Sequence, residues 1–123
     1  MKNILIVDDL EDNRELLSDL IKAYLPNKFK IHQANDGLQA IKKALIHDYS
    51  IILMDIDMPV LRGSKACALI KHCSLSKSMM RIIAITGNNR NDIEEFHNFD
   101  DYIAKPVSTS LQLLMKHLKE IAN

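Results

Sequence analysis

Three short apolar runs in this chain each end in charged residues. The run NILIV is followed by Asp8 and Asp9, SIILM by Asp55, and DYIA by Lys105 and Pro106. Continuous aliphatic runs of this length are typical of strands buried on both faces, as in parallel sheets covered by helices. Ligands of such sheets bind beyond the carboxyl ends of the strands. We therefore expect the three carboxylates and the ammonium group to meet at one edge of a sheet.

The rest of the chain alternates strand-like and helix-like patterns, as an α/β fold requires. Two further strands are expected in KFKIHQA (28–34) and RIIAIT (81–86). Apolar spacing predicts five helices: one with a stripe from Leu10 to Tyr24 that stops at Pro26, then 38–47, Ser64–His72, Asn91–His97 and Ser108–Ile121. Five strands and five helices fit a doubly wound, flavodoxin-like parallel sheet of order 2-1-3-4-5.

The apolar positions of these helices are expected to face the core. In chain order they are Leu10, Leu16, Leu17, Leu20, Ile21 and Tyr24; Leu38, Ile41 and Leu45; Cys67, Leu69 and Ile70; and Leu111, Leu114, Met115, Leu118 and Ile121.

Composition indicates a single small domain. The chain has 123 residues, of which 47% are hydrophobic, and no linker or repeat interrupts it. Basic and acidic residues balance at 16 each, so no bulk charge favours nucleic acid or an anionic membrane. The N-terminus opens directly into a strand pattern without a signal peptide or membrane span, which predicts a cytoplasmic location. Cys67 and Cys73 are expected to be reduced, structural thiols.

The predicted strand order brings Asp8 and Asp9 beside Asp55. Like charges in one pocket need a counter-charge, and a divalent cation supplies it. Magnesium suits an open site of a few carboxylates, since it keeps several waters and binds phosphate oxygens. Thr86 and Lys105 reach the same edge from the last two strands. A carboxylate with a metal on one side and a hydroxyl and an ammonium on the other predicts phosphoryl transfer, with an Asp55 oxygen as the attacking atom.

Four motifs together give the chain a family resemblance. ILIVDD, LMDIDMP with Gly63 after it, AIT and DDYIAKP occur in an order that resembles the response-regulator receiver domains of two-component signalling, in particular single-domain chemotaxis regulators. The resemblance implies that Asp55 accepts a phosphoryl group from a phosphohistidine. It also implies that Asp9 and Asp55 bind Mg2+ directly, that Asp8 binds it through water, and that the Asp57 backbone carbonyl is a further ligand.

The resemblance implies a switch as well. Thr86 and Lys105 would bind the phosphoryl oxygens, and Tyr102 would rotate inward as the Thr86 hydroxyl moves. These changes would alter a protein-binding face built from helix 91–97, strand DYIA and the last helix. A cis peptide at Lys105-Pro106 would aim the ammonium.

The implied partners are proteins. A histidine kinase or histidine phosphotransfer protein would dock on the first helix near Glu11, Arg14 and Glu15, and a downstream protein would read the switch. We expect no direct contact with nucleic acid or membrane, and a monomer or a weak phosphorylation-dependent dimer. Residues 1–123 would form the receiver domain without a separate output domain, and the chain would catalyse only its own phosphorylation and dephosphorylation.

Several alternatives remain open from the residues. Taken alone, Asp9 or Asp12 would be a cap of the first helix, but with Asp55, Thr86 and Lys105 at the same edge the metal role is favoured. Tyr102 would serve equally as plain core. A haloacid-dehalogenase-like phosphatase would use Asp57 as its general acid, whereas a pseudo-receiver would keep the fold and only bind proteins. The segment between Thr86 and Lys105 is shorter than is usual in the family by about one helical turn, roughly 3 to 4 residues, so the helix at 91–97 is expected to be short or distorted.

Overall fold

The sheet and its helices follow the predicted alternation. The structure is a computed structural model that describes residues 1–122 except 57, 59–60, 74–79 and 88–97. Its strands are β1 (Lys2–Val7), β2 (Phe29–Ala34), β3 (Ile51–Asp55), β4 (Arg81–Thr86) and β5 (Asp101–Ala104). Its helices are α1 (Glu11–Tyr24), α2 (Gly37–Ile46), α3 (Gly63–Cys73), the 3-10 helix η3 (Val107–Ser110) and α4 (Leu111–Ala122).

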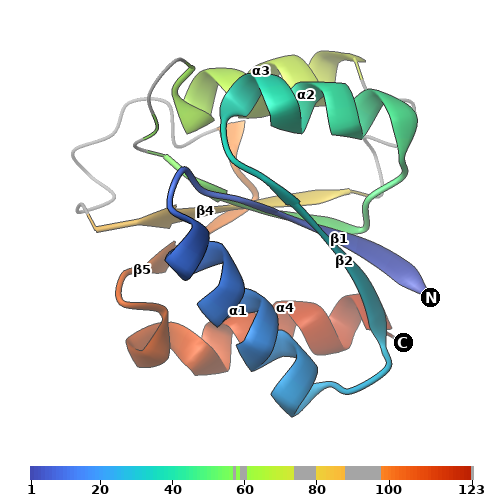
Figure 1. The fold of residues 1–123 in the computed structure, drawn as a ribbon, viewed down its shortest axis with the longest axis vertical. Helices are drawn as coiled ribbons and strands as arrows, with labels where there is room; N and C mark the ends of the chain where they lie inside the picture. Colours follow the sequence, from blue (N-terminus) through green and yellow to red (C-terminus); the bar gives the residue numbers. More distant parts are fainter. Residues whose placement is uncertain (57, 59–60, 74–79, 88–97, 123) are drawn as a thin grey trace.

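All five strands are parallel and lie in the order β2-β1-β3-β4-β5. The predicted doubly wound topology is thus confirmed. Helices α2 and α3 cover one face of the sheet, and α1 and α4 cover the other (Figure 1). The described part of the chain contains four α-helices, and the fifth helix, predicted at 91–97, lies outside the described residues.

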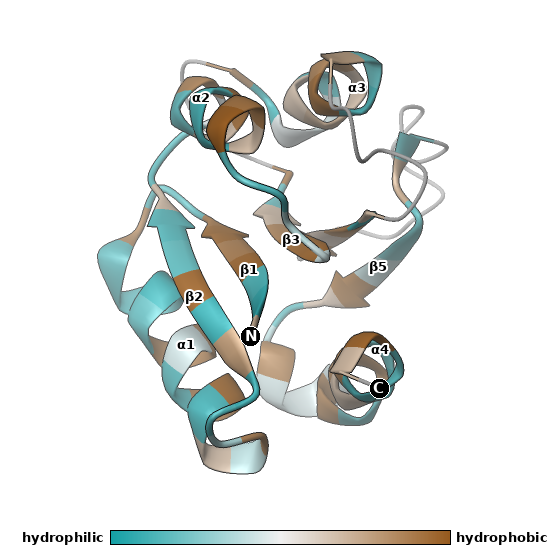
Figure 2. Cartoon of the chain, turned by 90° about the vertical axis from the view of Figure 1, so that its right-hand side faces the viewer, coloured by the Kyte–Doolittle hydropathy of each residue, from teal (hydrophilic) through white to brown (hydrophobic). Residues whose placement is uncertain are grey.

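The core forms two layers because side chains alternate along each strand. Leu5 and Val7 of β1 pack toward the layer under α2 and α3, whereas Ile4 and Ile6 pack toward α1 and α4. Strand β3, between β1 and β4, is buried at every residue. In the hydropathy colouring of Figure 2, β1 and β3 are accordingly hydrophobic between the two helical layers. None of the described helices is long and apolar enough to cross a membrane.

Several apolar residues that we expected in the core are exposed instead. The exposed fractions are 56% for Leu10, 60% for Leu16, 56% for Tyr24, 49% for Leu38, 61% for Leu45 and 40% for Leu69. A helix that lies on a sheet touches it along a narrow stripe, and in α1 the buried residues are Leu17, Ser18 and Ile21. Apolar spacing therefore located the helices correctly but overstated the width of their buried faces. In α4 the prediction is confirmed, since Leu114, Met115, Leu118 and Ile121 are buried.

Candidate functional site

Three carboxylates converge at the carboxyl ends of β1 and β3. Asp8, Asp9 and Asp55 each offer a carboxylate oxygen, and these oxygens all lie within 4.8 Å of one another. Asp8 and Asp55 are buried, whereas Asp9 is exposed to solvent. The site therefore has two carboxylates fixed in the protein and one at its open side. This is the convergence that the strand ends predicted.

The cation that follows β5 lies close to one of these carboxylates. The Lys105 Nζ lies 3.3 Å from Oδ2 of Asp55, whose side chain is only 5% exposed. The backbone N–H of Lys105 donates to the carbonyl oxygen of Thr86 at 2.8 Å, which holds the ends of β4 and β5 together. Thr86 itself is fully buried. The peptide bond between Lys105 and Pro106 is cis, as the resemblance implied.

Asp8 also organises the start of α1. Its Oδ1 accepts from the backbone N–H of Leu10 at 3.0 Å, and its Oδ2 accepts from Nδ2 of Asn13 at 3.3 Å. The N-cap position is Leu10, which makes no side-chain cap. The suggestion that Asp9 or Asp12 caps this helix is therefore wrong, because the N-cap residue is Leu10.

Arg14 supports the Asp8 backbone. Its Nη1 donates to the Asp8 carbonyl oxygen at 2.7 Å, and its Nε donates to Oε1 of Gln33 on β2 at 3.0 Å. We expected Arg14 on an exposed docking surface, but this side chain is half-buried and occupied. The sequence did not predict the hydrogen bond from Arg14 to the Asp8 carbonyl, because the charge pattern of a helix does not show which arginine bonds to the backbone of another segment.

Gly63 packs directly against the backbone of Asp55 and Ile56. A Cβ atom at position 63 would lie 2.3 Å from the Asp55 carbonyl oxygen and 2.8 Å from the Cα of Ile56. The Gly63 N–H also donates to the Ile56 carbonyl oxygen at 2.9 Å. Only a residue without a side chain allows α3 to begin this close to the end of β3.

Two predicted site residues remain, Tyr102 and Asp57. Tyr102 is half-buried and packs against the core layer on the α2 and α3 side of the sheet, while its neighbour Ile103 belongs to the opposite layer. Asp57, whose carbonyl was expected as a metal ligand and whose side chain was the alternative general acid, lies outside the described residues.

The donor set fits a hard divalent cation. Carboxylate oxygens are the ligands that Mg2+ and Ca2+ prefer, and a site of three carboxylates with one open side leaves room for waters or substrate oxygens. Lys105 places a positive charge 3.3 Å from Oδ2 of Asp55. The arrangement can therefore hold a cation beside a buried carboxylate and direct an ammonium to the same oxygen pair.

A groove of about 340 Å3 adjoins the carboxylates. One wall is formed by α1 and the other by the segment that follows β5. Its lining residues are Asp8, Asn13, Leu16, Leu17, Leu20, Ile85, Lys105, Pro106 and Val107. The groove is thus largely apolar, with the charged site at one end.

Comparison of sequences identifies similar proteins. The family model of the response regulator receiver domain matches residues 4–119 of the chain. The chain is 35% identical over 123 residues to hybrid signal transduction histidine kinase G of Dictyostelium discoideum, covering 98% of this chain and 3% of that protein. It is 35% identical over 107 residues to the transcriptional regulatory protein SrrA of Staphylococcus aureus, covering 85% of this chain and 42% of that protein. The chain thus spans less than half the length of these relatives.

Solved structures show the same fold. The response regulator TrrA of Thermotoga maritima, in complex with Mg2+-BeF, superimposes with a TM-score of 0.82 at 28% identity, covering 98% of this chain and 99% of that one. The receiver domain of Ssk1 of Saccharomyces cerevisiae, in complex with the histidine phosphotransfer protein Ypd1, gives a TM-score of 0.81 at 26% identity, covering 98% and 88%.

Proposed function

Because this chain belongs to the response regulator receiver domain family, we propose that Asp55 is its phosphoacceptor and that Asp8 and Asp9 assist as magnesium ligands. One observation carries the proposal: a buried carboxylate lies within 4.8 Å of two others and 3.3 Å from an ammonium. A side chain used only for packing would not require so concentrated a set of charges in a largely apolar fold.

The reaction is a phosphoryl transfer between two side chains. An Asp55 oxygen attacks the phosphorus of a phosphohistidine, the new O–P bond forms as the N–P bond breaks, and the donor imidazole leaves. When bound, Mg2+ offsets negative charge on the phosphoryl oxygens. Asp9 and Asp55 would hold the ion directly, Asp8 through water, and Asp57 through its backbone carbonyl. The buried position of Asp55 leaves its carboxylate little freedom, which favours an in-line approach.

Lys105 and Thr86 would receive the transferred group. The Lys105 ammonium lies 3.3 Å from Oδ2 of Asp55, so it would be close enough to bind an oxygen of a phosphoryl group on that carboxylate. The Thr86 hydroxyl is on the neighbouring strand and would donate to another oxygen. The Lys105 N–H donates a hydrogen bond to the Thr86 carbonyl oxygen. A displacement of Thr86 at the end of β4 would therefore also displace Lys105 after β5. Tyr102 lies three residues before Lys105 and would follow by changing its packing against the core.

The partner that supplies the phosphoryl group would dock along the groove between α1 and the segment after β5. Leu16 is 60% exposed there, beside Pro106 and Val107. This apolar surface leads to the carboxylates, so a donor helix laid along it would bring its phosphohistidine to Asp55. The Ssk1 receiver domain in complex with Ypd1 supports a histidine phosphotransfer protein as the class of partner. A downstream protein would then read the altered face around Tyr102 and α4.

Transfer from a phosphorylated histidine phosphotransfer protein tests this function. With Mg2+ present, label should move from the donor to the wild-type chain but not to Asp55→Asn. Leu16→Asp should slow transfer at least tenfold because it places a charge in the apolar groove, whereas Leu45→Asp, on the exposed side of α2, should leave the rate unchanged. Failure of wild type with this donor and with acetyl phosphate would refute Asp55 as the phosphoacceptor. Equal rates for the two leucine variants would refute only the docking groove.

A further inference from the structure

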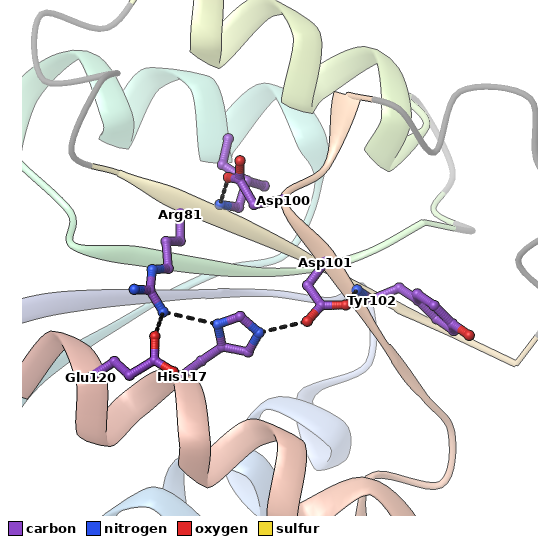
Figure 3. Close-up of polar contacts among 7 residues, drawn as sticks. Arg81, Asp100, Asp101, Tyr102, His117 and Glu120 are labelled. Atoms are coloured by element: carbon purple, nitrogen blue, oxygen red, sulfur yellow. Dashed lines mark hydrogen bonds and ion pairs between the residues drawn. The ribbon is translucent and has the colours of Figure 1, made fainter.

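A second polar cluster lies on the other side of the sheet from Tyr102, at the ends of β4 and β5 opposite the carboxylates (Figure 3). Nε2 of His117 on α4 lies 2.7 Å from Oδ2 of Asp101, the first residue of β5. Nδ1 of the same ring lies 3.1 Å from Nη1 of Arg81, the first residue of β4. Arg81 also forms an ion pair of 2.9 Å with Glu120, one turn further along α4. One imidazole thus links three elements.

The contacts of His117 fix the position of its proton. A guanidinium group has donors only, so the Nδ1 that faces Arg81 must be the acceptor. The proton of the neutral ring is then on Nε2, where it is donated to the Asp101 carboxylate. His117 is only 13% exposed, so water has little room to replace either contact. The ring is therefore held in a single tautomer by groups on both strands.

Asp101 transmits this arrangement to the backbone of Tyr102. The carboxylate that accepts from His117 through Oδ2 also accepts from the Tyr102 N–H through Oδ1, at 2.8 Å. Tyr102 pairs in the sheet with Ala84 of β4, two residues before Thr86. The His117 contacts thus set where β5 begins relative to β4, and the other ends of these strands carry Lys105 and Thr86.

We propose that His117 is a positioning residue for the receiver switch: as the Nε2–H tautomer it holds the Tyr102 backbone through Asp101 and ties β4 to α4 through Arg81. The proposal rests on the proposed role of Tyr102 and goes beyond it by assigning a titratable group to the same strand.

Protonation of His117 would have opposite effects on its two contacts. It would add a hydrogen to Nδ1, which faces the Arg81 guanidinium. Both groups would then be donors, so the hydrogen bond between them would be lost. The contact to Asp101 would become a charge-assisted hydrogen bond. The charged groups that contact the ring are Arg81 from β4 and Asp101 from β5, and Glu120 from α4 pairs with Arg81 beside it. Asp100 is engaged elsewhere, with the Ile82 N–H and with Lys71 of α3. Arg81 would then keep its ion pair with Glu120, and β4 would lose its contact with the ring.

Nuclear magnetic resonance of the unphosphorylated chain tests the proposal independently of phosphoryl transfer. The ring nitrogen shifts of neutral His117 should report the Nε2–H tautomer. As pH falls, the Tyr102 amide and the Arg81 side-chain signals should shift with the same midpoint as the His117 ring. In His117→Gln, whose amide can donate to Asp101 and accept from Arg81, both signals should stay at their high-pH positions. His72→Gln, at an exposed histidine of α3, should behave as wild type.

Three results would contradict the proposed role of His117. A neutral ring with its proton on Nδ1 would contradict the contact to Arg81. A Tyr102 amide that does not follow the His117 titration, or that still titrates in His117→Gln, would show that the histidine only fills space. Because no phosphodonor is used, such a failure leaves the assignment of Asp55 as phosphoacceptor untouched.

Discussion

The ammonium of Lys105 lies 3.3 Å from the carboxylate of Asp55, and the latter side chain is almost wholly buried. Asp55 is the last residue of β3 and Lys105 follows directly after β5, and these two strands are separated in the sheet by β4. Their contact brings a positive charge to a cluster that otherwise holds three carboxylates. The ion pair therefore links the stability of the metal-free protein to the residues proposed to carry out phosphoryl transfer.

Removing that ammonium should destabilise the metal-free protein. Lys105→Met removes the ammonium beside Asp55, so we expect a loss of about 1 to 2 kcal/mol in the free energy of unfolding, less than for a fully buried pair because Lys105 is partly exposed. Added Mg2+ should recover more stability in this variant than in wild type. Urea unfolding with and without Mg2+ measures both effects. Lys71→Met, which breaks the surface pair with Asp100, is the control and should cost less than about 1 kcal/mol with no magnesium effect.

Gly63→Ala should be strongly destabilising, by about 2 to 4 kcal/mol, because its Cβ would collide with backbone atoms of Asp55 and Ile56 that have no side-chain freedom to yield. Gly87→Ala is the matched control, since a Cβ at position 87 meets nothing within 4 Å. We expect that control to stay within about 0.5 kcal/mol of wild type. Thermal or urea unfolding of both variants gives the comparison, and similar losses would contradict the close approach of α3 to β3.

The two cysteines should differ sharply in reactivity. Burial raises the pKa of the Cys67 thiol from 9.0 to about 12, with Lys71 opposing the rise and Asp100 adding to it. Cys67 also donates to the Asn98 carbonyl oxygen at 3.0 Å, whereas Cys73 is exposed. A thiol reagent at neutral pH should therefore label one cysteine in native protein and two after unfolding, and Cys73→Ser should abolish the native signal. Rapid native labelling of Cys73→Ser would contradict the burial of Cys67.

Stability should also fall at high pH through Cys67. Because the folded thiol holds its proton more tightly than the unfolded one, its contribution is complete below pH 9.0 and is lost as pH rises toward about 12. Cys67→Ala should be less stable than wild type at neutral pH, because it leaves a small cavity. Between pH 9.0 and about 12, however, its free energy of unfolding should fall less than that of wild type. Unfolding free energies of the two proteins at several alkaline pH values measure the difference, and parallel curves would refute the linkage.

Acid should weaken the fold through His32. Burial lowers the pKa of His32 below 6.5, and the nearby His47, Lys43 and Lys30 lower it further. The unfolded ring thus takes up a proton before the folded ring, so this stabilisation is present above about pH 6.5 and declines as pH falls below it. The ring also shares a 2.7 Å hydrogen bond with the Tyr49 hydroxyl. His47→Gln should raise the pKa of His32 measured by magnetic resonance, while His72→Gln should not.

The strand ends made the main features of the site predictable. Asp8, Asp9, Asp55 and Lys105 follow apolar runs, and in a parallel sheet the carboxyl ends of such runs share one edge. The positions of these residues in the fold therefore follow from the order of the strands alone. The need for glycine at position 63 was visible only as part of a family motif, because the collision with the Asp55 backbone depends on how closely α3 approaches β3.

Other features depend on packing that the sequence does not reveal. Leu16 and Tyr24 lie on a helical stripe but are exposed, since the spacing of apolar residues does not show how much of a helix face is covered. The hydrogen bond from the Leu10 amide to Asp8 was missed because the carboxylate belongs to a residue outside the helix. His117 gave no signal either, because its partners Arg81 and Asp101 begin two strands that are remote from it in sequence.

Chemical trapping of the phosphorylated residue tests the central claim most directly. The chain is treated with acetyl phosphate and Mg2+, reduced with borohydride, which converts an aspartyl phosphate to homoserine, and mapped by peptide mass. Homoserine should appear at position 55 in wild type and in Asp12→Asn, an exposed-carboxylate control on α1. It should decrease when Mg2+ is withheld and be absent in Asp55→Asn. Homoserine at another aspartate of the wild-type chain, or an unchanged yield in Asp55→Asn, would contradict the assignment of Asp55 as the phosphoacceptor.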